Sequence, residues 1–249
     1  MIVSYKNKFI FLHCRKTAGS SITVSLTRYL GQSDIVLGSI TDCIRQGVRP
    51  PRRMLMEALR HPKFSAIYKK LIVGEVWNFV SSSNKSYYSG ILGEVPQHAP
   101  AKMVSQAYEA EWAEFTKFCV VRNPWCKTLS DYYWKSKGVQ DPPSFSDFVK
   151  ALSSGDPSVK IVPLHNSNWD MCAIDDKICV DRIIRFEDLN NGLNDVIKEI
   201  GIDWDGWLPQ SKLNSTKKIR QYRDYYDSET RNIISDIYGR EIDHFNYRF

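Results

Sequence analysis

Residues Phe9-Ile10-Phe11-Leu12-His13-Cys14-Arg15-Lys16-Thr17-Ala18-Gly19-Ser20-Ser21-Ile22 constrain the fold more than any other stretch of this chain. An apolar run predicts a buried strand, and it gives way to two cations, two small residues and three hydroxyls before a helical pattern starts at Ile22. Backbone N–H groups at a helix N-terminus favour an anion, and Lys16 adds a full positive charge. This order predicts a loop that binds phosphate or sulfate; the alternative is an ordinary loop that Ser20 caps.

Length and composition limit the kind of protein. A chain of 249 residues fits one large domain, or one domain with an insertion. Hydrophobic residues make up 43%, enough for a sizeable core, and the net charge of +6 favours anionic ligands without requiring nucleic acid as a partner. No apolar run reaches the 18 residues expected of a membrane span, and the first residues lack the layout of a signal peptide. A cytoplasmic location is therefore expected.

Cysteine usage bears on redox environment and on metal binding. No two cysteines form a Cys-x-x-Cys pair, and several sit in apolar, strand-like contexts. Buried free thiols are therefore expected rather than disulfides or a zinc site. The cysteines are Cys14, Cys43, Cys119, Cys126, Cys172 and Cys179.

Strands and helices alternate along most of the chain. The patterns predict strands at 8–13, 115–121 and 182–186, and helices at 20–30, 101–110, 124–135, 144–152, 168–172, 190–200 and 227–239. The segment 33–41 is ambiguous, Pro50-Pro51 predicts two short helices in the basic stretch 42–70, and 71–97 is expected to be irregular with one strand. The alternation indicates an α/β fold with a mainly parallel sheet, in which ligands bind at the carboxyl ends of the strands.

A second polar motif follows the strand predicted at 115–121. Arg122-Asn123-Pro124 would lie at the same edge of the sheet as Lys16, and Ser130 lies on the helix that follows. Arginine suits bidentate binding of phosphate, and a serine hydroxyl can donate to the same group. The alternative is an arginine in an ion pair and a serine on a helix face.

Together the two motifs resemble the sulfotransferases that use 3′-phosphoadenosine 5′-phosphosulfate (PAPS), most of all the carbohydrate branch typified by heparan sulfate 2-O-sulfotransferase. The first loop of that family often reads His-x-x-Lys-Thr-Gly-Gly-Thr-Ser, which corresponds here to residues 13–21, and its Val-Arg-Asn-Pro-Trp is intact at 121–125. Arg15 and Ala18 depart from the loop pattern without removing a donor. The similarity covers most of the chain but is weak or absent through about 32–95. Further matches are Arg185-Phe186-Glu187-Asp188-Leu189, Asn214-Ser215-Thr216, Tyr222-Arg223-Asp224-Tyr225-Tyr226 and Asp243-His244-Phe245-Asn246-Tyr247.

This resemblance implies a P-loop-like three-layer α/β fold, with a central, mainly parallel sheet flanked by helices in a single domain over 1–249. Residues 32–95 would form a variable insertion on the acceptor side. Arg122 and Ser130 would bind the 3′-phosphate of PAPS, and Thr216 and Lys218 would close over the nucleotide. The residues that would bind its 5′-phosphosulfate are Arg15, Lys16, Thr17, Ala18, Gly19, Ser20 and Ser21.

The same resemblance places the catalytic base at His98. A histidine titrates near neutral pH and can remove the proton of an acceptor hydroxyl. Without the resemblance, the sequence favours a structural role for His98, as a loop histidine that caps the helix beginning at Pro100. His13 is the other candidate for the base, but its place at a strand end suggests packing or loop support. With Lys16 as second catalytic residue, the expected reaction moves the sulfuryl group of PAPS to a hydroxyl of a small-molecule or saccharide acceptor by in-line displacement. The product would be PAP, and no metal is expected.

Two other functions remain open at this point. A P-loop nucleotide kinase is disfavoured because the spacing G-x-x-x-x-G-K-[ST] is missing: the only glycine of the loop follows the lysine. A non-catalytic module that binds anions or glycans could use the basic residues between 45 and 70, which are otherwise a solvated surface. The sequence carries no signal for a particular oligomeric state.

Overall fold

The computed structural model describes residues 1–60, 76–156, 159, 161, 168–209 and 221–249. The predicted closing residues Thr216 and Lys218 therefore lie outside the described residues. Contacts divide the chain into two compact units, Met1–Val120 with Asp170–Ser211, and Val121–Trp169 with Lys212–Phe249. Among the described residues, no helix combines the length and the apolar character needed to cross a membrane.

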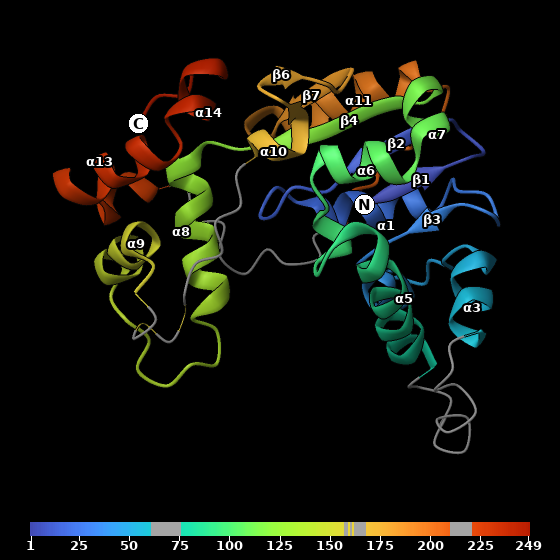
Figure 1. Cartoon of the computed structure of the whole chain (residues 1–249), viewed down its shortest axis with the longest axis horizontal. Coiled ribbons are helices and arrows are strands. Elements are labelled where there is room, and N and C mark those ends of the chain that lie inside the picture. The colour runs from blue at the N-terminus through green and yellow to red at the C-terminus, as the bar shows by residue number, and fades with distance from the viewer. Residues whose placement is uncertain (61–75, 157–158, 160, 162–167, 210–220) are drawn as a thin grey trace. The chain divides into compact units, whose positions relative to one another are not determined.

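A five-stranded sheet forms the centre of the first unit, in the order β3-β1-β2-β4-β7 (Figure 1). β2 pairs in parallel with β4, whereas β1 is antiparallel to both β2 and β3, so β2, β3 and β4 all point the same way. Asp181, just before β7, hydrogen-bonds to Lys117 near the start of β4, so these two strands also begin at the same end. The bounds are Ile2–Ser4 (β1), Phe9–Leu12 (β2), Ile35–Val36 (β3), Thr116–Val121 (β4) and Arg182–Arg185 (β7).

The central strands of the sheet carry apolar side chains, and helices cover them. All four residues of β2 are fully buried, and the ring of Phe118 packs on Phe9 and Phe11. Such continuous apolar strands are typical of parallel sheets covered on both faces. The helices of this unit are α1 (Gly19–Thr27), α2 (Ile40–Arg45), α3 (Arg52–Leu59), α5 (Val76–Leu92), η1 (Pro96–His98), α6 (Ala101–Ala107), α7 (Glu109–Glu114), η2 (Phe186–Asp188) and α11 (Leu189–Glu199); α10 (Trp169–Cys172) precedes the hairpin β5 (Ala173–Ile174) and β6 (Lys177–Ile178).

Aromatic side chains dominate the second unit. Tyr132 of α8 packs edge-on against Phe145 and Phe148 of α9, and Trp125 packs against the last residue, Phe249. Such pairs combine a large buried area with a preferred geometry, so they hold short helices together. The helices are α8 (Pro124–Lys135), α9 (Phe145–Ser154), η3 (Tyr222–Tyr225), α13 (Ser228–Ile237) and α14 (Gly239–His244).

The mixed α/β class with a central, mostly parallel sheet is confirmed, and so are the two short helices on either side of Pro50-Pro51. The expectation of an irregular segment at 71–97 is wrong for the described part, because Val76–Leu92 form α5; residues 71–75 lie outside the described residues. The free-thiol prediction is confirmed: all six cysteines are free, and four of them are buried.

The reason for the error at α5 is visible in its buried face. Val80, Asn84, Tyr88 and Leu92 recur every four residues and are buried, which is a helical period. Serines between these positions make the segment look polar and hide the period. The ambiguous segment 33–41 contains β3 and the start of α2.

A buried carboxylate fixes the edge of the sheet near β1. Asp34 is fully buried and accepts hydrogen bonds from Ser4 Oγ (2.7 Å) and from the backbone N–H groups of Tyr5 (2.9 Å), Lys6 (3.2 Å) and Gly31 (2.8 Å). These donors belong to the turn that joins β1 to β2 and to the segment before β3. One buried side chain therefore joins the end of β1 and the turn that follows it to the segment before β3.

Replacing this carboxylate tests the arrangement. Asp34→Ala should lower the free energy of unfolding by about 2–4 kcal/mol, because one buried and three partly buried donors lose a charged acceptor. The measurement is urea unfolding followed by circular dichroism. Asp203→Ala, at an exposed aspartate, should change stability by less than about 0.5 kcal/mol. Equal effects of the two substitutions would contradict the role given to Asp34.

Candidate functional site

The loop between β2 and α1 has an unusual backbone. Lys16 and Ala18 both have φ of 61°, in the left-handed region that residues other than glycine rarely adopt. Ala18 occupies the N-cap position of α1, and Ser20 lies inside the helix. The alternative in which Ser20 caps this helix is therefore wrong. The first N–H groups of a helix have no acceptor within the helix, so this end of α1 offers donors to an anion.

Thr17 and Gly19 fix the shape of the loop. The Thr17 side chain is fully buried, and its Oγ1 donates to the carbonyl oxygen of Cys14 at 2.9 Å. Gly19 lies so close to His13 that a Cβ atom there would be 1.9 Å from the Cδ2 of the imidazole. The hydroxyl of Thr17 therefore closes the loop, and the missing side chain of Gly19 makes room for the His13 ring.

His98 is joined to this loop by a short hydrogen bond. Its Nδ1 lies 2.6 Å from the carbonyl oxygen of His13, and the two imidazole rings are 4.6 Å apart. A carbonyl oxygen can only accept, so Nδ1 carries the hydrogen, and in the neutral ring Nε2 then keeps its lone pair. His13 itself is buried, with its ring stacked on Phe11. The geometry thus makes His13 a support and leaves His98 with the nitrogen that can take a proton.

Three buried cysteines of the first unit, Cys14, Cys119 and Cys172, interact with one another. Hydrogen bonds to Cys14 and Cys172, together with burial, hold the pKa of the Cys119 thiol well above its usual value. A buried thiol with a raised pKa is unreactive, so Cys119 serves packing. Among the residues that the structure describes, no group of three or more histidine, cysteine, aspartate or glutamate side chains is arranged to hold a metal ion.

In the second unit, Arg122 lies at the start of α8. Its side chain is only 4% exposed, and its Nη2 lies 3.2 Å from the Sγ of Cys126. Asn123 caps α8, since its side-chain oxygen accepts from the N–H groups of Trp125 and Cys126, while its Nδ2 donates to the carbonyl oxygen of Arg248 at 3.0 Å. The helix end is thereby anchored to the C-terminal residues, and Arg122 is held at the positive end of a 12-residue helix.

Ser130 belongs to the same part of the second unit. Cys126 and Ser130 are four residues apart on α8, so Arg122, Cys126 and Ser130 follow one face of the helix. The Ser130 side chain is 7% exposed. Within each unit, therefore, the candidate residues gather: Lys16 to Ser21 with His98 in the first, and Arg122 with Ser130 in the second.

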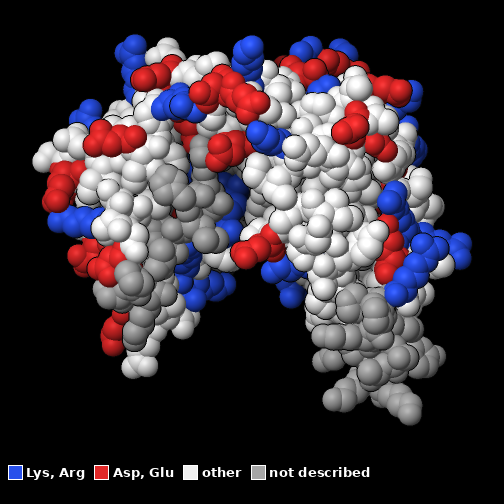
Figure 2. Space-filling view, viewed as in Figure 1, with Lys and Arg blue, Asp and Glu red and all other residues white. Residues whose placement is uncertain are grey.

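Basic residues of the stretch 45–60 lie on the surface of the first unit. Figure 2 shows lysine and arginine side chains gathered over α3. Arg53 pairs with Glu57 at 2.7 Å and Arg45 with Asp42 at 3.4 Å, so part of this charge is neutralised within its own helices. The exposed arginines of the stretch are Arg45, Arg49, Arg52 and Arg60.

A family model described as "Sulfotransferase family" matches residues 1–248 of this chain. The match extends over both units and over both polar motifs. Comparison with curated proteins and with solved structures gave no match.

The close approach of Gly19 to His13 can be tested with a matched pair of glycine substitutions. Gly19→Ala should lower the free energy of unfolding by about 1–3 kcal/mol, because the new methyl group must displace the His13 ring. Gly90→Ala is the control, since Gly90 lies in α5 with nothing within 4 Å of the added Cβ, and it should leave stability unchanged or raise it by up to about 1 kcal/mol. Urea unfolding measures both. If Gly19→Ala left the free energy of unfolding unchanged, the position of the His13 ring would not depend on the absence of a side chain at residue 19.

Proposed function

We propose, from the premise that this chain belongs to the sulfotransferase family, that it moves the sulfuryl group of PAPS to a hydroxyl of a carbohydrate acceptor. Membership makes the chain an enzyme that transfers sulfate, and PAPS is the donor in this family. The carbohydrate acceptor rests on the likeness of residues 13–21 and 121–125 to the carbohydrate branch. His98 as base rests on the geometry of the first unit.

Each unit contains side chains that suit one anionic group of a nucleotide. In one unit, Lys16 stands in a loop whose backbone turns through two left-handed residues into the start of α1. In the other unit, the buried Arg122 has Ser130 two turns further along α8. We propose that the loop binds the 5′-phosphosulfate, and that Arg122 and Ser130 bind the 3′-phosphate of the same molecule. Closure by Thr216 and Lys218 stays a prediction.

His98 is proposed to remove the acceptor proton. When bound, PAPS supplies an activated sulfuryl group: the acceptor oxygen bonds to sulfur, the bond from sulfur to the 5′-phosphate oxygen breaks, and PAP leaves. Nε2 of His98 takes the hydroxyl proton, because Nδ1 is already committed to the His13 carbonyl. The same hydrogen bond stabilises the imidazolium that forms, since Nδ1–H remains a donor to that oxygen.

Lys16 is proposed to stabilise charge on the leaving group. Its ammonium and the N–H groups at the start of α1 favour negative charge at one place. Transfer of this kind depends on positioning and electrostatics, as phosphoryl transfer does, and these fixed donors need no reorganisation during the reaction. Residues 32–95, which resemble the family least, are proposed to supply contacts to the acceptor.

The observation that carries the proposal is the hydrogen bond between His98 Nδ1 and the His13 carbonyl, because it joins a histidine to the loop that we propose binds the anion. Labelled PAPS, incubated with desulfated heparin or chondroitin, tests the activity directly. A thermal-shift comparison separates the alternatives: PAP should stabilise the protein, whereas ATP with magnesium should not. Stabilisation by ATP with magnesium alone would favour a kinase, and PAP binding without transfer to any acceptor would favour a binding module.

Substitution of His98 separates catalysis from binding. His98→Ala should lower kcat about 10²- to 10⁴-fold, the usual contribution of a general base, and leave PAP affinity within about twofold. His98→Asn is the matched control for structure, because the asparagine amide can still donate to the His13 carbonyl but cannot act as base. Turnover of labelled PAPS and calorimetric titration with PAP measure the two properties. Lost PAP affinity with normal rates at saturation would overturn the assignment.

Substitution of Arg122 tests recognition of the 3′-phosphate. Arg122→Ala should weaken PAP binding about 10- to 100-fold, because a charge-assisted bidentate contact is lost. It should have little effect on adenosine 5′-phosphosulfate, which lacks that phosphate. Arg182→Ala, at an exposed arginine that pairs with Glu199, is the control and should change neither affinity. Equal losses for both nucleotides would remove Arg122 from this role.

A further inference from the structure

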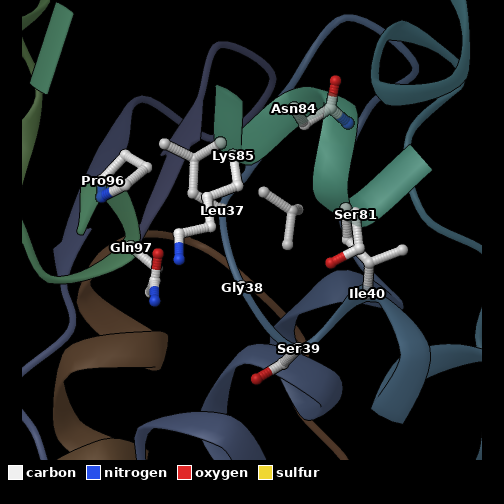
Figure 3. Close-up of a pocket in the computed structure, with 10 residues that line it drawn as sticks. Leu37, Gly38, Ser39, Ile40, Ser81, Asn84, Lys85, Pro96 and Gln97 are labelled. Carbon is white, nitrogen blue, oxygen red and sulfur yellow. The ribbon is translucent and has the colours of Figure 1, made fainter. Parts of the chain in front are cut away.

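A pocket of about 220 Å³ opens in the first unit, just beyond the carboxyl end of β3 (Figure 3). Three segments line it: the turn after β3, one face of α5, and η1. Its polar lining residues are Ser39, Ser81, Asn84, Lys85 and Gln97. The pocket is smaller than the roughly 300–1,000 Å³ that hold drug-sized ligands, so it suits a single small unit of a larger molecule.

Strand register places this pocket at the same edge of the sheet as the Lys16 loop. Ile2 of β1 pairs with Phe11 of β2 on one side and with Val36 of β3 on the other. Phe11 and Val36 are therefore level, two strand spacings or roughly 10 Å apart. Since β2 and β3 run in the same direction, the loop after one and the turn after the other leave the sheet together.

The short helix η1 links the pocket to the proposed base. Gln97 lines the pocket and packs so tightly against Gly38 that a Cβ on Gly38 would lie 2.9 Å from the Cβ of Gln97. The next residue, His98, is hydrogen-bonded through its Nδ1 to the carbonyl oxygen of His13. The lining residue Gln97 is thus the sequence neighbour of the proposed base, in the same short helix.

The polar groups of the pocket retain hydrogen-bonding capacity. Asn84 is 2% exposed; its Nδ2 donates to the Met54 carbonyl at 3.0 Å, but its Oδ1 is buried and has no hydrogen-bond partner among the described residues. A buried acceptor without a partner is costly, so this oxygen is a weak point in the packing of the pocket wall. Lys85 is exposed and makes no ion pair within the part of the chain that the structure describes. The Ser39 and Ser81 hydroxyls also make no hydrogen bond there.

We propose that this pocket is an acceptor subsite in which Lys85 selects for a negatively charged group on the unit that is sulfated or on its neighbour. The inference rests on the proposed function and assigns the pocket to the acceptor side of that reaction. Hydroxyls of the acceptor meet the two serine hydroxyls, which donate or accept. The ammonium of Lys85 pairs with a carboxylate or sulfate. A hydroxyl-rich compound with one anionic group matches this set, whereas a purely apolar one would leave every polar group without a partner.

Two sugars that differ only in charge test the proposal. Methyl β-D-glucuronide and methyl β-D-glucoside share a ring, and binding of each to the protein with PAP present is followed by ligand-observed NMR. The glucuronide should bind about two- to fivefold more tightly than the glucoside, the usual gain from one solvent-exposed charge pair. Lys85→Gln should abolish this difference, and Lys85→Arg should retain it. Lys198→Gln, at an exposed lysine of α11, should leave it unchanged.

Each outcome separates this inference from the proposed function. Equal binding of the two sugars by the wild-type protein, no binding of either, or an unchanged preference in Lys85→Gln would overturn the subsite, even with PAP binding intact. Absence of PAP binding in the wild-type protein would instead overturn the proposed function. Lys85→Gln should leave PAP affinity unchanged, and a matching loss of PAP affinity would show that Lys85 acts on the nucleotide.

Discussion

The hydrogen bond between His98 Nδ1 and the His13 carbonyl is the interaction on which the site in the first unit depends. It ties a 3₁₀ turn about 85 residues downstream to the first residue beyond β2, and it decides which ring nitrogen carries the hydrogen. Gly19 takes part indirectly, because only a residue without a side chain leaves room for the His13 ring. One short contact therefore sets the tautomer of His98 and joins its ring to the loop between β2 and α1.

Backbone strain at the loop has a consistent explanation. Lys16 and Ala18 adopt left-handed conformations that cost roughly 1–2 kcal/mol each for residues with a Cβ. The buried strands and the Thr17–Cys14 hydrogen bond supply the fixed surroundings in which such conformations persist. At Ala18 the resembling family carries glycine, which adopts this conformation at no steric cost. Strain of this kind is characteristic of turns that present N–H groups to a ligand.

Local patterns predicted much of the fold. Strands β2 and β4 could be predicted because each is a continuous apolar run, and α8 because Asn123-Pro124 marks the start of a helix. Both signals are local. Helix α5 could not be predicted, because its buried face includes the polar residues Ser83 and Asn84 and therefore shows no clear helical period of apolar residues. The pocket beyond β3 could not be predicted for the same reason: Ser81, Asn84 and Lys85 line it together only when the segment is helical and packs beside β3.

By itself, the sequence determined the chemical type of each group: a lysine and hydroxyls after a buried strand, an arginine at a helix start, and a histidine before another helix. It also determined the α/β class, because strands buried on both faces require covering helices. Only the tertiary structure decided that His13 supports while His98 keeps a basic nitrogen, and that α5, η1 and the turn after β3 enclose one pocket. The physical reason is that hydrogen-bond direction and burial depend on neighbours distant in sequence, which periodicity and spacing do not encode.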